Sequence, residues 1–262
     1  MNETLSEYKP YDETKLNFSK MPGAFTDAEK ENMESFVNHI LETYSLDEYM
    51  YARGGLGLIS KKIENIIANA GVSFTQKNIL EFGAGICKTS AVISKLYDVN
   101  KITCVDISEG LLKQLAPRVI SMLGGDLSKF QFVIGDMNQI TKFPTSFDAI
   151  VCYGAVHHLH LPEYFFANLQ NILNPGGFIL ILDEPTIPSV PMIPKSPGKK
   201  YLNAHYAKRF KGDNENIYSV AQYCRIFGKN WKVKRLDTRR FSKILPYQPL
   251  KVFMSDFLLF EI

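Results

Sequence analysis

Short apolar segments alternate with amphipathic ones through the middle of the chain. Runs of five or six apolar or β-branched residues recur, and segments with the 3.6-residue apolar spacing of a helix separate them. Because short apolar strands joined by helices are typical of a parallel sheet covered on both faces, the pattern predicts an α/β, doubly wound fold. The expected strands are 78–82, 101–106, 130–134, 148–153 and 178–182, and the expected helices are 88–97, 109–123 and 163–173.

Other patterns flank this alternating region. Residues 26–50 have helical spacing and start with a cap-like Thr-Asp-Ala-Glu sequence, so we expect residues 1–55 to form a helical lid over one end of the sheet. Prolines recur at every third position from 185 to 197, which indicates an extended polyproline segment or an ordinary stiffened loop. Farther on, 220–227 is predicted to be helical, and 231–241 and 251–262 alternate like two paired strands.

Composition adds limits on the class of protein. With 262 residues, 45% of them hydrophobic and 22% charged, the chain is typical of a globular protein and not of a disordered one. No apolar run approaches the roughly 20 residues of a membrane helix, and the first 20 residues lack the apolar stretch of a signal peptide. The four cysteines are far apart in sequence. We therefore expect a cytoplasmic protein with reduced thiols and no membrane partner.

The net charge of +3 hides an asymmetry. Residues 185–262 hold 15 Lys and Arg against 5 Asp and Glu, whereas residues 1–184 hold 15 against 22. A basic C-terminal third can attract an anionic substrate such as a phosphate, a nucleotide or RNA. It can equally be a solvated positive face.

Polar residues or glycines stand at the carboxyl end of each of the five expected strands. Ligands of doubly wound sheets bind outside these ends. Five such ends together predict one binding site there. The residues concerned are Glu81 to Gly85, Asp106, Gly135 to Met137, Tyr153 with Gly154, and Asp183 with Glu184.

The residue types at these ends suit a nucleoside ligand with a cationic group. Gly83 and Gly85 allow a sharp turn and a close approach to a ligand. Asp106 can accept both hydroxyl protons of a ribose, and Asp136 can accept the amino protons of an adenine. Glu81 beside the glycine turn would repel a pyrophosphate and suit an amine.

Five motifs resemble those of the class I S-adenosylmethionine-dependent methyltransferases of small-molecule type. The first four strand ends carry ILEFGAGICKTS, ITCVDIS, FVIGDMNQI and FDAIVCYGAVHHLHLPE, and LQNILNPGGFILILDEP follows. The resemblance covers about residues 60–184. Cys87 replaces the glycine usual in the first motif. A nicotinamide site is disfavoured, because Lys88 stands where its third glycine belongs.

The resemblance implies a mostly parallel, seven-stranded sheet with an antiparallel last strand, within a methyltransferase domain of residues 56–262. It implies S-adenosylmethionine as cofactor and residues 185–215 as a substrate-recognition insertion. Gly83 to Gly85 would hold the methionine end, and Asp136 with Met137 the adenine. The implied cofactor-binding residues are Arg53, Glu81, Gly83, Ala84, Gly85, Asp106, Ile107, Asp136, Met137 and Tyr153.

Among these, the Tyr153 backbone would lie near the sulfonium and Asp106 would bind the ribose. Arg53 would pair with the methionine carboxylate, with a plain surface position as the alternative.

Histidines are the candidates for a general base. His157, His158 and His160 follow the fourth expected strand, and His158 is the first choice among them. His205, in the segment after the prolines, is the alternative. The three histidines can instead pack and hydrogen-bond the loop. No carboxylate or cysteine stands at ligand spacing within the histidine cluster, so we expect no metal site.

The acceptor is expected to be a small molecule. The sequence lacks an Asn/Asp-Pro-Pro-Tyr motif after the fourth strand, which argues against methylation of amino groups on DNA bases. The leading hypothesis is O-methylation of a small metabolite or sugar, anionic or nucleotide-linked. The alternatives are an RNA methyltransferase that uses the basic third as a phosphate track, and a non-catalytic protein of the same fold that binds the cofactor. The oligomeric state is left open.

Overall fold

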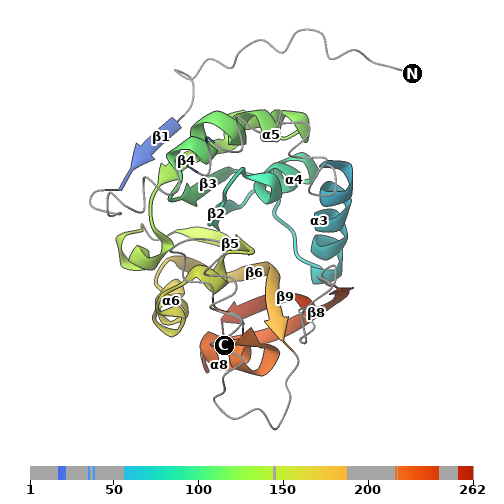
Figure 1. Ribbon diagram of the computed structural model, residues 1–262, viewed down its shortest axis with the longest axis vertical. Helices are drawn as coiled ribbons and strands as arrows, with labels where there is room; N and C mark the ends of the chain where they lie inside the picture. Colours follow the sequence, from blue (N-terminus) through green and yellow to red (C-terminus); the bar gives the residue numbers. More distant parts are fainter. Residues whose placement is uncertain are drawn as a thin grey trace.

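The computed structural model describes residues 17–21, 35, 38, 56–143, 146–187, 216, 218–241 and 253–261. Most of the expected lid (1–55) and of the expected insertion (185–215) therefore lies outside the described residues. The described part forms one twisted sheet with helices on both faces (Figure 1). No helix in this part of the chain is long and apolar enough to cross a membrane.

The sheet order is β1-β4-β3-β2-β5-β6-β9-β8, and β7 pairs with β6. Neighbours from β1 to β6 are parallel, whereas β9 is antiparallel to both β6 and β8. The strands are β1 (Asn17–Lys20), β2 (Asn78–Phe82), β3 (Lys101–Asp106), β4 (Phe130–Ile134), β5 (Phe147–Tyr153), β6 (Leu173–Ile187), β7 (Tyr218–Ser219), β8 (Trp231–Phe241) and β9 (Phe253–Glu261).

Helices join the parallel strands and follow the last of them. They are α3 (Leu56–Ala70), α4 (Lys88–Leu96), the π-helix η2 (Leu111–Leu115), α5 (Ala116–Met122), the short 3₁₀ helices η3 (Leu127–Lys129), η4 (Met137–Lys142) and η5 (Val156–His158), α6 (Pro162–Leu169) and α8 (Val220–Phe227). The α/β, doubly wound fold with an antiparallel last strand is thus confirmed.

The number of strands differs from the prediction, because the described residues contain nine strands and not seven. One addition, β1, pairs with β4 at the edge of the sheet, where Phe18 stacks on Phe132 with ring centroids 5.1 Å apart. The other, β7, is a two-residue pairing with the end of β6. Both are too short to produce a periodic pattern in the sequence.

Two predicted helices are shorter than expected. Within 109–123, a wide π turn precedes α5, because Pro117 has no N–H to donate and the Ala116 N–H donates to the Leu111 carbonyl five residues back. The predicted helix 163–173 ends at Leu169, and Leu173 already pairs with Phe147 of β5.

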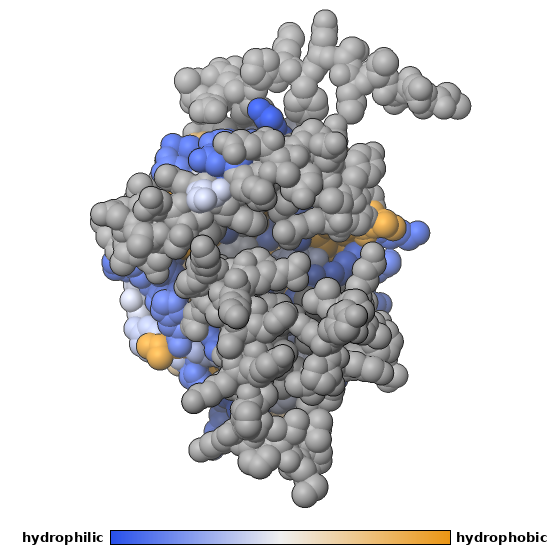
Figure 2. Space-filling view, viewed as in Figure 1, coloured by the Kyte–Doolittle hydropathy of each residue, from blue (hydrophilic) through white to orange (hydrophobic). Residues whose placement is uncertain are grey.

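Two apolar clusters lie on opposite faces of the sheet. One contains buried side chains of α3, α4 and α5, and the other contains those of α6 and α8. In the second cluster, Tyr223, Phe227 and Phe257 contact one another with ring centroids 5.3–5.8 Å apart. Each fully buried side chain of this size stabilises the fold by about 1.5–3 kcal/mol. The described surface in Figure 2 is mostly hydrophilic, with small hydrophobic spots.

Candidate functional site

A tight turn after β2 starts the site. Gly83 and Gly85 have positive φ angles of 62° and 53°, and Cys87 has one of 57°. Cys87 therefore adopts the left-handed conformation that a glycine would take more easily, at a cost of about 1–2 kcal/mol. Its side chain is completely buried, so α4 begins at Lys88 directly against the sheet.

The turn borders a cavity of about 160 Å³. Its lining joins the end of β2, the start of α4, the end of β5 and the helix α3. A Cβ on Gly83 would lie only 2.5 Å from the Ala155 Cβ, so the turn packs tightly on the loop after β5. The residues that line the cavity are Ile59, Glu81, Gly83, Ala84, Gly85, Ile86, Lys88, Thr89, Leu111 and Tyr153.

Glu81 brings a buried carboxylate to this cavity. Its Oε2 accepts hydrogen bonds from the Ser90 N–H (3.3 Å) and from the Ser90 hydroxyl. Its Oε1 has no hydrogen-bond partner among the described residues. Burial raises the pKa of Glu81 to about 7, against the lowering effect of the Ser90 hydrogen bonds. This acid beside the cavity therefore keeps one buried acceptor oxygen that a cationic donor could satisfy.

Asp106, at the end of β3, is tied to the glycine turn. Its Oδ2 accepts the Gly85 N–H at 2.7 Å, and its Oδ1 accepts the Ser108 N–H at 2.8 Å. Burial raises the pKa of Asp106, and these backbone hydrogen bonds oppose the rise. Ile107 follows and is half-buried.

The end of β4 has a similar arrangement. Asp136 accepts hydrogen bonds from the Asn138 N–H and side-chain amide, both at 2.8 Å, and thereby caps η4. Met137 is half-buried and packs against the cluster on the α6 and α8 face.

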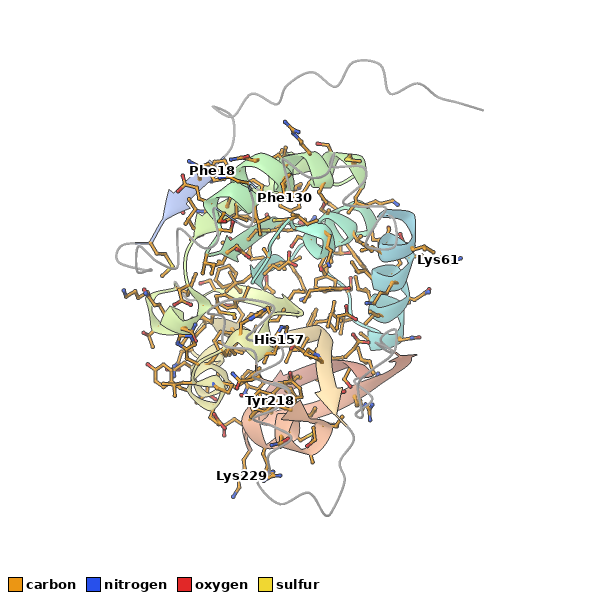
Figure 3. All side chains as sticks on the ribbon, in the orientation of Figure 1. Phe18, Lys61, Phe130, His157, Tyr218 and Lys229 are labelled. Atoms are coloured by element: carbon orange, nitrogen blue, oxygen red, sulfur yellow. The ribbon has the colours of Figure 1, made fainter. Side chains whose placement is uncertain are left out.

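His157 is anchored by a buried acid. Its Nδ1 lies 3.0 Å from Glu184 Oε2, and the same carboxylate accepts the N–H groups of Ala155, Val156 and His157 and the hydroxyl of Tyr223. Burial alone would raise the pKa of Glu184, but His157 and these hydrogen bonds lower it below its ordinary value. Figure 3 shows His157 near the ends of β5 and β6.

His158 has a different environment. Its ring centroid lies 4.0 Å from that of His157. Burial lowers the pKa of His158 to about 4, and the neighbouring His157 adds to this effect. The ring is therefore neutral at pH 7. His160 is exposed, and its N–H donates to the Asn138 side chain at 3.0 Å.

Lysines surround the Tyr153 side chain. The Lys88 Nζ lies 4.0 Å from the centre of the tyrosine ring, and the Lys62 Nζ lies 3.0 Å from the tyrosine oxygen. The Tyr153 hydroxyl donates to Asp183 Oδ2 at 2.8 Å. Burial and the adjacent Asp183 raise the pKa of Tyr153, so the phenol stays protonated.

The structure thus brings most of the predicted site residues to one edge of the sheet. Glu81, Gly83, Ala84, Gly85 and Tyr153 line one cavity. Asp106 contacts that cavity's glycine turn, Asp136 and Met137 end the next strand, and His157 and His158 follow Tyr153.

Two predicted site residues are not described by the structure, and two residues at the site were not predicted. Arg53 and His205 lie outside the described residues. Lys62 was not identified from the sequence, because its helix carries no recognisable motif. Lys88 was considered only as the residue that replaces the third glycine of a nicotinamide-binding motif, and not as a residue of the site. Among the described residues, no group of three or more His, Cys, Asp or Glu side chains lies together as a metal site would require.

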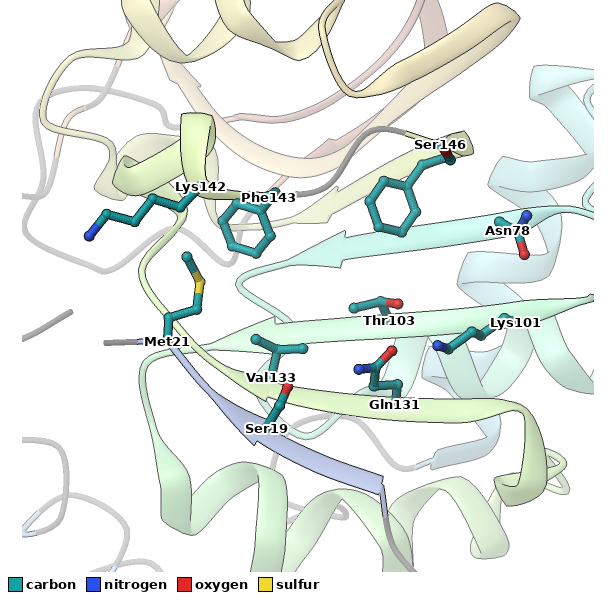
Figure 4. A pocket seen from close by; sticks show the side chains of 11 residues that line it. Ser19, Met21, Asn78, Lys101, Thr103, Gln131, Val133, Lys142, Phe143 and Ser146 are labelled. Carbon is teal, nitrogen blue, oxygen red and sulfur yellow. The ribbon is translucent and has the colours of Figure 1, made fainter. Parts of the chain in front are cut away.

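A second hollow, of about 380 Å³, lies on the face of the sheet over β1, β4, β3 and β2 (Figure 4). It shares no lining residue with the cavity at the glycine turn. Its two lysines, Lys101 and Lys142, are exposed, and none of its lining side chains is a buried polar group without a partner. We therefore place the functional site at the glycine turn.

Comparisons with known proteins bear on the family and the fold. Residues 80–181 match the family described as methyltransferase domain. An uncharacterized protein of Synechococcus is 31% identical over 103 residues, which cover 39% of this chain and 24% of that protein. The matched segment thus spans about a quarter of that relative's length.

Two solved structures share the fold. Phosphoethanolamine N-methyltransferase 2 of Haemonchus contortus, solved with S-adenosyl-L-methionine, has a TM-score of 0.56 and 16% identity, over 77% of this chain and 52% of that one. An arsenic(III) S-adenosylmethionine methyltransferase of Chlamydomonas reinhardtii has a TM-score of 0.57 and 16% identity, over 72% and 65%.

Residues 80–181 are therefore a methyltransferase domain, and the sheet around them has the fold of the class I S-adenosylmethionine-dependent methyltransferases. The predicted methyltransferase domain and fold are confirmed. Members of this class use S-adenosylmethionine as the methyl donor.

The two glycines of the turn allow a matched test of its packing. Both have a positive φ, so an alanine at either position has the same backbone cost of about 1–2 kcal/mol. Only the Cβ at position 83 meets another atom, Ala155 Cβ, whereas position 85 faces open space. We expect Gly83→Ala to lower the free energy of unfolding by about 1–3 kcal/mol more than Gly85→Ala, measured by urea denaturation. Equal losses would contradict the close packing.

Proposed function

We propose that this chain transfers the methyl group of S-adenosylmethionine to an oxygen of a small, anionic metabolite or sugar. The observation that carries the cofactor assignment is the cavity at the glycine turn, which is lined by Glu81, an acid whose buried Oε1 has no hydrogen-bond partner among the described residues. Lys88 lines the same cavity. One acidic and one basic side chain match the zwitterionic amino-acid end of this cofactor.

The other cofactor contacts follow from the strand ends. The backbone of Gly83 to Gly85 would hold the methionine end, and Asp106 the ribose with Ile107 beside it. Asp136 and Met137 would contact the adenine. Each of these residues lies at the carboxyl end of β2, β3 or β4, where ligands of such sheets bind.

The backbone of Tyr153 would lie near the sulfonium at the end of β5, and Arg53 is proposed to pair with the methionine carboxylate. When bound, S-adenosylmethionine supplies an electrophilic methyl group. The chain's contribution is then to align the acceptor and exclude water, and alignment of this kind can contribute about 7–11 kcal/mol.

His158 is the proposed base for the acceptor hydroxyl. It follows the end of β5, and burial lowers its pKa to about 4, so the ring is neutral at pH 7 and can act as a proton acceptor. His157, fixed by Glu184, orients the adjacent ring from 4.0 Å away. His205 is the alternative base.

The basic C-terminal third supports an anionic acceptor and leaves RNA as the second candidate. In the described part of β8, Lys232, Lys234 and Arg235 are exposed. Since successive side chains of a strand point to opposite faces, Lys232 and Lys234 share one face and Arg235 points to the other. We favour the small molecule, because these three basic side chains of β8 do not share one face of the strand.

Incubation of the protein with methyl-labelled S-adenosylmethionine and a fractionated cell extract tests the acceptor class. We expect label in the small-molecule fraction, where mass spectrometry would identify the product and the methylated atom. Label in the RNA fraction would replace our proposal by the RNA alternative. Cofactor binding without label in any fraction would favour a non-catalytic protein.

The pKa of Glu81 predicts a pH-dependent cofactor affinity. Its pKa of about 7 in the free protein means that the carboxylate is mostly protonated at pH 6 and mostly ionised at pH 7.5. Only the ionised form pairs with the ammonium of the cofactor. We expect the Kd of S-adenosylhomocysteine to fall about fivefold to tenfold between these pH values, measured by calorimetry.

Glu81→Gln should remove this dependence and bind weakly at both pH values. Glu163→Gln on the exposed face of α6 is the control and should behave as the wild type. A pH dependence that survives in Glu81→Gln would assign it to another group.

His158→Ala tests the base once the acceptor is known. We expect kcat to fall by about 100-fold or more, since general-base catalysis is worth at least that much, with the Kd of S-adenosylhomocysteine within twofold. His160→Ala, an exposed neighbour, should keep the full rate. An unchanged kcat in His158→Ala would move the base elsewhere, and His205→Ala would be examined next.

A further inference from the structure

Three polar side chains from separate elements meet beside the cofactor cavity. Lys62 comes from α3, Tyr153 from the end of β5 and Asp183 from β6. The Lys62 Nζ lies 3.0 Å from Tyr153 Oη and 2.5 Å from Asp183 Oδ1, and the Tyr153 hydroxyl donates to Asp183 Oδ2 at 2.8 Å. Each group thus contacts the other two, and the Lys62 and Asp183 side chains are only 26% and 15% exposed.

Asp183 takes part in this cluster from a strained backbone. Its φ is +57°, which costs a residue other than glycine about 1–2 kcal/mol. The Asp183 N–H is held by Asp256 Oδ1 of β9 at 2.8 Å. Strained residues of this kind persist only where the surrounding contacts hold them, and they gather at functional sites. The ion pair with Lys62 is a contact that offsets this strain.

The cluster contacts two parts of the chain that line the cavity, Tyr153 and the helix α3. Tyr153 is one wall, and Ile59 of α3, one helical turn before Lys62, is another. The Lys88 Nζ lies 4.0 Å from the centre of the tyrosine ring. A single side chain, Lys62 of α3, therefore joins two parts of the cavity lining, the helix α3 and the Tyr153 side chain.

We propose that Lys62 is a positioning residue for the cofactor. It fixes α3 and the Tyr153 side chain around the bound methionine end, and it slows release of the cofactor. This inference rests on the proposed function, because it takes the cavity at the glycine turn as the cofactor site.

The experiment measures binding and release of S-adenosylhomocysteine by calorimetry and by displacement kinetics. Lys62→Met keeps the length of the side chain and removes its charge. Lys61→Met, on the exposed side of the same helix, is the matched control. We expect Lys62→Met to raise the dissociation rate about tenfold, the effect of losing one charge-assisted hydrogen bond. Lys61→Met should stay within twofold of the wild type.

Lys62→Arg separates positioning from plain helix stability. An arginine restores the charge and the donors, so we expect its dissociation rate to return to within threefold of the wild type. If Lys62→Met fails to fold, Tyr153→Phe removes only the hydroxyl and should raise the dissociation rate at least threefold with an unchanged circular dichroism spectrum.

The outcomes distinguish the two levels of the proposal. A wild-type protein that does not bind S-adenosylhomocysteine overturns the proposed function itself. Wild-type binding together with an unchanged dissociation rate in Lys62→Met, or in Tyr153→Phe where that variant replaces it, overturns only the role of Lys62. A Lys62→Arg variant that releases the ligand as fast as Lys62→Met also overturns it.

Discussion

The buried carboxylate of Glu184 is the interaction on which the rest of the site depends. It accepts three successive backbone N–H groups after β5, the His157 ring and the Tyr223 hydroxyl of α8. Removing one partner from a buried pair of this kind typically costs about 3–5 kcal/mol. The loop that it holds includes Ala155, against which Gly83 packs. Through Ala155, this carboxylate thus supports the loop against which the glycine turn packs.

The acids at the strand ends differ in how completely they are paired. Glu184 has hydrogen-bond donors on both oxygens, and its pKa lies below the ordinary value. Glu81 has donors on one oxygen only, and burial raises its pKa. A fully paired buried acid stabilises the fold, whereas a half-paired one leaves an interaction for a ligand to complete. This difference separates the structural acid from the proposed ligand-binding acid, although both stand at the carboxyl ends of central strands.

The sequence predicted the parallel strands and the edge where the site lies, because both leave local patterns. Apolar runs mark β2 to β6, and the polar residue after each run marks its end. The pattern could not predict β1, whose four residues give no period, or the π turn before Pro117. The sequence pattern also could not predict contacts between side chains that are far apart in the sequence. Lys62 and Asp183 are 121 residues apart, and only the fold brings them together.

The roles of His157 and His158 could not be separated from sequence for the same reason. The two residues are adjacent, yet the His157 Nδ1 lies 3.0 Å from Glu184 Oε2, whereas burial is the largest effect on the pKa of His158. Burial then acts on both kinds of titratable group in the same direction, toward the neutral form. It raises the pKa of Glu81 and lowers that of His158. Without a ligand, burial therefore disfavours a charge on both Glu81 and His158. A cofactor that brings its own ammonium favours the ionised form of Glu81, and this makes the acid sensitive to the charge of what enters the cavity.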